Sequence, residues 1–136
     1  MNKLKGTIKN ILSSGNISLV DVDSEGINFT AIIIGTKDNT LYLREGKEIL
    51  VLFKESEVSI GKDFSGEISL RNQIEGVISA IKQGEVFSKI TLTFGNRQIN
   101  SLITTRSVTK LGLKEKDMVT AFIKANEVLL MDPENE

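Results

Sequence analysis

An internal repeat is the feature that most constrains the fold of this chain. Shifting the 136-residue sequence by 70 positions aligns it with itself without a gap. The identical pairs include Gly6/Gly76, Ile8/Ile78, Ile11/Ile81, Ser18/Ser88, Leu41/Leu111, Leu43/Leu113, Glu45/Glu115, Lys54/Lys124, Glu57/Glu127 and Val58/Val128. Self-similarity at a fixed spacing is the signature of a repeated structural unit. The sequence therefore predicts two homologous modules, which we place at residues 1–61 and 62–136.

Each module has the pattern of several short strands. Apolar residues alternate around Gly6, and a glycine inside a strand suggests a bulge or a sharp bend. Gly95-Asn96 between two alternating runs is a hairpin signal. In the first module we expect strands at residues 4–12 and 27–34 and a further strand that begins at residue 17. In the second module we expect strands at residues 74–81, 87–94, 98–104, 118–124 and 127–131.

A short helical segment is expected after the third strand of each module. It spans Ser107–Leu111 in the second module, with Ser107 as its N-cap, and residues 36–41 are a weaker counterpart in the first. Five short strands and one helical turn in fewer than about 70 residues are typical of an OB-type barrel. We predict an all-β chain of two tandem, small OB-like Greek-key barrels, each with one short helix.

The composition excludes several functional classes. The chain has no Cys and no His, so it lacks the commonest metal ligands and the commonest general base. With no spaced carboxylate cluster visible, we predict that it is not an enzyme. Its formal net charge of −1 argues against general nucleic-acid binding. No signal peptide or membrane-length apolar run is present, so we expect a cytoplasmic location and no membrane partner.

Four motifs in the second module resemble a known family. They are Ser69-Leu70-Arg71-Asn72-Gln73, Ile103-Thr104-Thr105-Arg106-Ser107-Val108, Leu111-Gly112-Leu113-Lys114-Glu115 and Phe122-Ile123-Lys124-Ala125. In order and spacing they resemble the molybdate-binding Mop (molybdenum-pterin-binding) family, also called the TOBE domain. Leu70 departs from the alanine usual in that family. The repeat is similar to the tandem, or di-Mop, arrangement.

The resemblance implies an oxyanion site in the second module. Ser69 and Arg71 would meet the anion, Leu70 would offer its backbone N–H, and Asn72 belongs to the same binding stretch. Thr104 and Ser107 would donate from the helix entry, and Lys124 would close the site with the backbone near Ala125. The first module has Ile34 and Lys37 at the positions of Thr104 and Ser107. Of Thr104, Ser107 and Lys124, only Lys124 has an identical counterpart there, Lys54, so we expect a degenerate site that contributes scaffold or surface.

The chemistry of this donor set agrees with the implied ligand, molybdate or tungstate. Molybdate is a tetrahedral dianion with acceptor oxygens and no proton to donate. The implied site offers charge from Arg71 and Lys124, hydroxyl donors, and backbone N–H groups of a helix entry. Hydrogen phosphate would need an acceptor, whereas only the size of the pocket could reject sulfate. Taken singly, the Ser and Thr residues are ordinary caps and the cations ordinary surface charges.

We therefore expect cytoplasmic binding of molybdate or tungstate, for storage, homeostasis or sensing. The resemblance implies a homo-oligomer, dimer or trimer, with sites at module interfaces. One alternative is a regulatory or assembly module of a molybdate-responsive regulator or of a transporter ATPase, although no helix-turn-helix or GxxxxGK[ST] pattern occurs here. A second is an oligonucleotide-binding OB module, but the phenylalanines mostly follow the apolar alternation, so no direct nucleic-acid partner is expected.

Overall fold

The computed structural model describes residues 1–136 and divides them into two compact units. Unit 1 contains Met1–Phe53 together with Lys124–Glu136, and unit 2 contains Lys54–Ile123. Each unit therefore includes a segment that belongs, by the sequence repeat, to the other module. No helix is long and apolar enough to cross a membrane.

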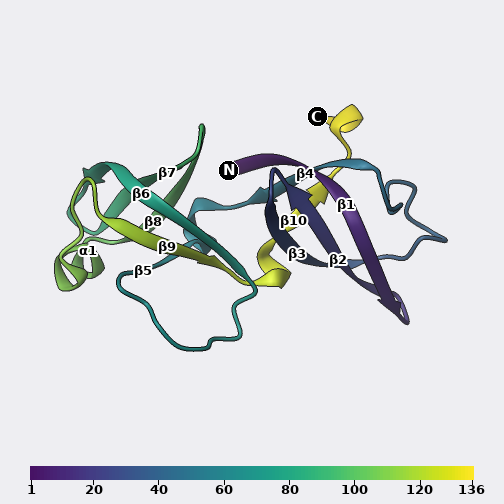
Figure 1. The fold of residues 1–136 in the computed structure, drawn as a ribbon, viewed down its shortest axis with the longest axis horizontal. Coiled ribbons are helices and arrows are strands. Elements are labelled where there is room, and N and C mark those ends of the chain that lie inside the picture. Colours follow the sequence, from purple (N-terminus) through teal and green to yellow (C-terminus); the bar gives the residue numbers. More distant parts are fainter. The chain divides into compact units, whose positions relative to one another are not determined.

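Unit 1 is an antiparallel barrel of five strands (Figure 1). Its strands are β1 (Asn2–Ser14), β2 (Ile17–Ser24), β3 (Ile27–Ile34), β4 (Glu48–Phe53) and β10 (Leu129–Met131). They lie in the order β10-β4-β1-β2-β3, and the two edge strands β10 and β3 lie close to each other. This order, with its edge strands brought together, is that of the partly open Greek-key barrel of the OB type.

Unit 2 repeats the same order with its own strands. They are β5 (Ser59–Gly61), β6 (Asn72–Gln83), β7 (Phe87–Phe94), β8 (Arg97–Thr104) and β9 (Met118–Ile123), ordered β5-β9-β6-β7-β8 with β5 also contacting β8. The remaining elements are the α-helix α1 (Thr105–Leu111) and the 3₁₀ turns η1 (Glu55–Glu57), η2 (Ala125–Glu127) and η3 (Pro133–Asn135). The predicted fold class, two small all-β OB-like barrels, is confirmed.

The strand registers of the two units are related by the same 70-residue shift. Leu4 pairs with Val51 in unit 1, and Ile74 pairs with Ala121 in unit 2. The long first strand of each unit changes register between Ile8 and Asn10 and between Ile78 and Ala80. The predicted irregularity is therefore a bulge that follows the glycine.

Gly6 itself is required by close packing. A Cβ atom there would lie 2.5 Å from Val22 Cγ1 and 2.9 Å from the Asp23 carbonyl oxygen. Real Cβ atoms do not approach other heavy atoms so closely, so strands β1 and β2 can approach this closely here only because the residue has no side chain.

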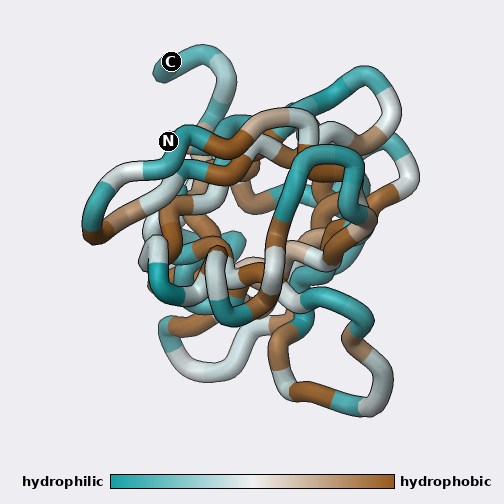
Figure 2. Tube along the Cα trace, turned by 90° about the vertical axis from the view of Figure 1, so that its left-hand side faces the viewer, coloured by the Kyte–Doolittle hydropathy of each residue, from teal (hydrophilic) through white to brown (hydrophobic).

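Aliphatic residues fill both cores, with one difference. Phe29 and Phe53 are fully buried in unit 1, with ring centroids 6.1 Å apart. The corresponding positions of unit 2 hold Ile99 and Ile123, which are also buried. Figure 2 shows hydrophobic and hydrophilic residues interspersed along the chain, with a hydrophilic C-terminus, and every second residue of β2 is buried. This alternation places one face of each strand in a core.

The α-helix occurs in unit 2 alone, so the expectation of one in each module is wrong. Residues 36–41 form turns, in which the Thr36 N–H donates to Asn39 Oδ1 at 2.8 Å. Helix α1 ends at Gly112, whose left-handed φ of 62° suits glycine. Tyr42 occupies the corresponding position, where a side chain disfavours that conformation. The first module thus lacks this helix-ending signal.

The expected boundary between residues 61 and 62 differs from the division into compact units. Strand β5 follows the first repeat in sequence but pairs with β9, Ser59 opposite Phe122. Strand β10 ends the second repeat but pairs with β4, Leu129 opposite Leu52. Figure 1 shows β10, in yellow, beside the early strands of unit 1. The two repeats have exchanged their last strands.

Candidate functional site

The lead-in cluster consists of Ser69, Leu70, Arg71 and Asn72. Ser69–Arg71 form an irregular segment that enters β6 at Asn72. Ser69 and Arg71 are exposed, Leu70 is half-buried and Asn72 is fully buried. The Gln73 side-chain amide donates to the Leu70 carbonyl at 3.1 Å, which shapes the backbone just before the strand. A hydroxyl and a guanidinium thus face solvent from a backbone that is anchored at one end.

The helix-start cluster consists of Thr104 and Ser107. Thr104 ends β8 and is the N-cap of α1, because its Oγ1 accepts the Ser107 N–H at 3.1 Å. The expectation that Ser107 is the N-cap is therefore wrong by three residues. Thr104 also donates its hydroxyl proton to Ser107 Oγ at 2.8 Å. Ser107 accepts in this bond, so its own proton remains available for an outside acceptor.

Neighbouring polar contacts hold the helix start in place. The Thr105 hydroxyl donates to the Gly84 carbonyl at 2.8 Å and lies 2.7 Å from Ser88 Oγ. These bonds tie the first turn of α1 to the β6–β7 connection. The Thr104 and Ser107 hydroxyls are consequently displayed from a fixed backbone.

Two further residues lie beside this cluster and were not selected from the sequence. Thr104 and Arg106 line a surface hollow of about 240 Å³ together with Glu85 and Val86. Arg106 is within the motif that carried the family resemblance, but its charge alone did not distinguish it from a solvated surface residue. Glu85 is an acceptor, so this hollow combines one cation with one anion.

Lys124 and Ala125 belong to unit 1, because the exchange moves the end of the second repeat into that unit. Lys124 is exposed and precedes η2, whereas Ala125 is buried. Lys54, assigned from the sequence to the first module, belongs to unit 2 and precedes η1. The exchange has thus traded the two equivalent lysines between the units.

The two clusters of unit 2 lie at opposite ends of β6. Asn72 begins β6, whereas Gln83, at its other end, pairs with Ser88 near the start of β7. Thr104 pairs with Phe87, the first residue of β7. A strand of 12 residues spans roughly 36 Å when extended. Unit 2 therefore does not bring its own lead-in and helix-start clusters together.

The connector before the lead-in cluster is attached to the barrel. Lys62 Nζ donates to the Gly112 carbonyl at 3.1 Å and lies 3.4 Å from Asp117 Oδ2. The ring of Phe64 meets that of Phe122 edge-on, with centroids 5.1 Å apart. Burial acts to raise the pKa of Asp117, but hydrogen bonds from Lys114 and Lys62 and the charge of Lys114 outweigh it and lower the pKa.

The donors in these clusters are hydroxyl and cationic groups, and they suit an anion. The chain has no group of three or more His, Cys, Asp or Glu side chains arranged to hold a metal ion. Neither cluster combines a nucleophile with a base.

Comparisons with known proteins agree with the fold and with this arrangement of motifs. The TOBE domain pattern matches residues 68–130. The chain is 32% identical over 136 residues to the molybdenum-pterin-binding protein MopA of Rhodobacter capsulatus, covering 97% of this chain and 51% of MopA. It is 31% identical over 129 residues to the molybdenum transport protein ModE of Herbaspirillum seropedicae, covering 86% and 48%.

A solved structure decides the family. The cytoplasmic molybdate-binding protein ModG, in a form with molybdate bound, superposes with a TM-score of 0.92 at 32% identity, covering 97% of this chain and 96% of ModG. The chain belongs to the Mop/TOBE family. It is a tandem member, and it spans about half the length of MopA and ModE. The TOBE match ends at residue 130 and so crosses the point where the exchange divides this repeat between the units.

Proposed function

We propose that this tandem Mop/TOBE chain binds molybdate or tungstate in the cytoplasm, for storage, homeostasis or sensing. The observation that supports this best is its similarity, along nearly its whole length, to molybdate-bound ModG. The donor chemistry is consistent with it, since Ser69 and Arg71 are exposed and Ser107 retains a hydroxyl proton. Lys124 supplies a further exposed cation from unit 1. We assign the chain no catalytic role.

The proposal includes self-association. Because the lead-in and helix-start clusters of unit 2 lie at opposite ends of β6, an anion held by residues of both kinds needs a second copy of the chain. We therefore propose a homo-oligomer, dimer or trimer, with the anion held where copies meet. Light scattering of the size-fractionated protein with and without molybdate tests this, and a strict monomer that binds molybdate would contradict it.

Calorimetric titration tests the ligand. Wild-type protein is titrated with molybdate, tungstate and sulfate, beside Arg71→Ala and the matched control Arg44→Ala, which removes an exposed arginine of unit 1. Loss of a charge-assisted contact of about 2 to 3 kcal/mol predicts molybdate binding weaker by about 30- to 150-fold in Arg71→Ala. Arg44→Ala should bind like the wild type. The absence of molybdate and tungstate binding by the wild type would overturn the proposal.

A second candidate is the anion-binding half of a longer regulator or transporter. The 31% identity to ModE, of which the chain spans 48% of the length, motivates this candidate. The same titration applies, because such a module would bind the same anion. The two roles differ in whether binding changes the behaviour of a fused or associated partner domain.

A further inference from the structure

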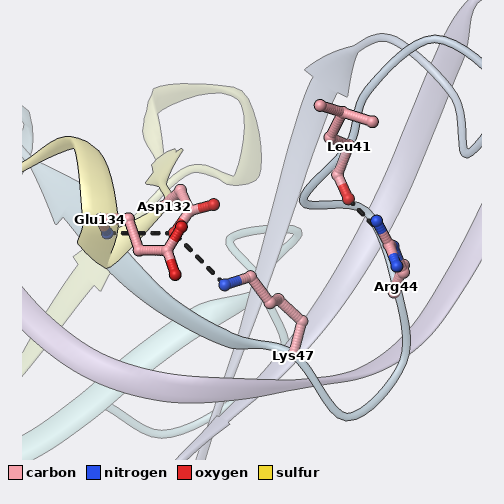
Figure 3. Close-up of polar contacts among 5 residues, drawn as sticks. All are labelled: Leu41, Arg44, Lys47, Asp132 and Glu134. Atoms are coloured by element: carbon pink, nitrogen blue, oxygen red, sulfur yellow. Dashed lines mark hydrogen bonds and ion pairs between the residues drawn. The ribbon is translucent and has the colours of Figure 1, made fainter.

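Two ion pairs occupy equivalent places in the two units with their charges reversed. In unit 1, Lys47 Nζ lies 3.3 Å from Asp132 Oδ1 (Figure 3). In unit 2, Lys62 Nζ lies 3.4 Å from Asp117 Oδ2. Positions 47 and 117 are related by the repeat, and so are positions 62 and 132. One residue of each pair precedes the fourth strand of its barrel, and the other follows the exchanged strand, β10 or β5.

We propose that these residues form a pairing code that directs each terminal segment into the barrel of the other repeat. The terminal segments are residues 59–62, which contain β5, and residues 129–132, which contain β10. If each segment returned to its own repeat, the same register would place Lys62 beside Lys47 and Asp132 beside Asp117. Two attractive pairs would become two repulsive ones, so the charges favour exchange over return.

These charged side chains are partly buried, which strengthens both attraction and repulsion between them. The side chains of Lys47 and Asp132 are 31% and 18% exposed, and those of Lys62 and Asp117 are 26% and 13% exposed. Solvent and salt screen partly buried charges less than charges on an open surface. Figure 3 shows the Asp132 carboxylate between Lys47 and the backbone N–H of Glu134, which donates to it at 3.1 Å. Asp132 is thereby fixed toward Lys47.

Residue size gives a second, independent part of the code. Gly61 lies against Phe122, and a Cβ atom at Gly61 would be 2.7 Å from Phe122 Cε2. The residue equivalent to Gly61 in the other segment is Met131, which pairs with Leu50 as Gly61 pairs with Thr120. Return of β10 to its own repeat would therefore place a methionine where even a Cβ atom requires the Phe122 ring to move. In unit 1 the position of Phe122 is occupied by Leu52, which is smaller.

The residues that follow β5 and β10 also favour exchange. Phe64 packs on Phe122 in unit 2, and the equivalent residue after β10 is Glu134. Glu134 instead lines a hollow of unit 1 with Arg44 and Lys47 (Figure 3). If the segment that contains β10 returned to unit 2, the Phe64 ring would no longer contact Phe122, and the Glu134 carboxylate would take its place. Charge, size and aromatic packing thus all select the segment of the other repeat.

Disulfide competition in the full chain tests the code, since the chain has no cysteine of its own. In the variant L52C/S59C/L129C, the thiol introduced at position 52 can form a bond with the one at position 129 after exchange, or with the one at position 59 after return. The protein is unfolded, refolded under oxidising conditions and digested, and the two disulfide-linked peptides are quantified by mass spectrometry. We expect the bond between positions 52 and 129 to predominate, because directly opposed residues of an antiparallel pair are within disulfide range.

Reversing the terminal charges should redirect the segments. In the K62D/D132K background, exchange creates two repulsive pairs and return creates two attractive ones. We expect the ratio of returned to exchanged bonds to rise about tenfold or more, given the usual strength of partly buried ion pairs. Adding G61M/M131G should raise the ratio further, because it transfers the glycine to the segment that returns to Phe122. An unchanged ratio in both backgrounds would overturn the proposal.

A quadruple variant covers the case in which K62D/D132K does not fold. The combination K47D/K62D/D117K/D132K reverses both partners of each pair, so exchange again makes two attractive contacts with an unchanged net charge. We expect it to restore the predominance of the bond between positions 52 and 129. Its melting temperature should stay below that of the wild type, because lysines at positions 117 and 132 cannot accept the backbone N–H groups of Lys114 and Glu134. A ratio of disulfides that stays at the value of K62D/D132K would also overturn the proposal.

Discussion

Units 1 and 2 share a strand order and a register, yet only unit 2 carries a capped α-helix. At the position of Thr104, the cap of α1, unit 1 has Ile34, which is 84% exposed. Most buried positions, in contrast, are apolar in both units, and the buried polar residues include the equivalent pairs Asn2/Asn72 and Ser18/Ser88. The comparison teaches that core packing preserves the barrel, while the residues at strand ends are free to gain or lose donors.

Truncation of a core aromatic should give the largest difference between the units. Phe53→Ala removes a fully buried ring in contact with Phe29 and should lower the free energy of unfolding by about 3 to 5 kcal/mol. Ile123→Ala, at the same position of unit 2, should cost less because fewer buried atoms are removed. Denaturant unfolding gives both values, and hydrogen exchange identifies which unit opens. A larger loss of stability for Ile123→Ala than for Phe53→Ala would contradict this expected difference between the units.

Substitution of the equivalent glycines, Gly6 and Gly76, should give the second largest difference in stability between the units. Gly6→Ala places a Cβ atom 2.5 Å from Val22 Cγ1 and 2.9 Å from a carbonyl oxygen, whereas in Gly76→Ala the nearest contact, with the Thr93 carbonyl oxygen, is 3.0 Å. We expect a loss of about 2 to 3 kcal/mol for Gly6→Ala and about 1 kcal/mol for Gly76→Ala. Thermal unfolding of the two variants measures this, and equal losses would show that the strands are equally close.

Removal of the helix cap should have a smaller effect that is confined to unit 2. Thr104→Ala deletes the oxygen that accepts the Ser107 N–H and should cost about 1 kcal/mol. Thr104→Ser should retain most of the stability. The matched control is Ile34→Ala in unit 1, which removes an exposed side chain and should change stability by less than about 0.5 kcal/mol. Similar losses at positions 34 and 104 would contradict the difference between the units.

The ion pairs of Asp117 and Asp132 should give the smallest difference between the units, seen as a pH dependence of the stability. Hydrogen bonds and lysine charges, partly opposed by burial, lower the pKa of both Asp117 and Asp132. A lowered pKa contributes stability above the ordinary Asp value of about 3.9, and this contribution is lost as the pH falls through the pKa of the folded state. Asp117→Asn should therefore destabilise the protein near neutral pH and become equivalent to the wild type in strong acid.

The same measurement compares the two units. Asp117 interacts with both Lys62 and Lys114, whereas the ion pair of Asp132 is with Lys47. Thermal melts between about pH 2 and 7 should thus show a larger loss for Asp117→Asn than for Asp132→Asn. Each carboxylate also accepts one backbone N–H, Asp117 that of Lys114 and Asp132 that of Glu134. The reverse order would therefore indicate that the Glu134 bond is stronger than the Lys114 bond by more than the second lysine contributes.

Local patterns in the sequence predicted much of the fold. The strand at residues 27–34 and the hairpin turn at Gly95 were placed correctly, because alternation and turn residues act over a few positions. The helix at the end of β8 was found, but its cap was misplaced from Thr104 to Ser107, since both hydroxyl residues are good caps. The turn at residues 36–41 was misread because the repeat aligns it with the helical segment, although Leu41 is the one apolar residue that it contains.

The candidate site was only partly predictable. The motif residues identified two clusters of donors, but nothing local states that β6 separates them. Arg106 and Glu85 were missed because exposed charges are common and only the structure places them beside Thr104. The assignment of Lys124 to a compact unit likewise depended on the pairing of strands distant in sequence.

The sequence by itself determined the repeat and the all-β class, because these follow from residue spacing. The tertiary structure alone decided which barrel each last strand completes. Strands β5 and β10 have three residues each, and such a short strand carries no local preference for one sheet edge over another. That choice depends on residues far apart in the chain, through the charges at positions 47, 62, 117 and 132 and the space beside Phe122.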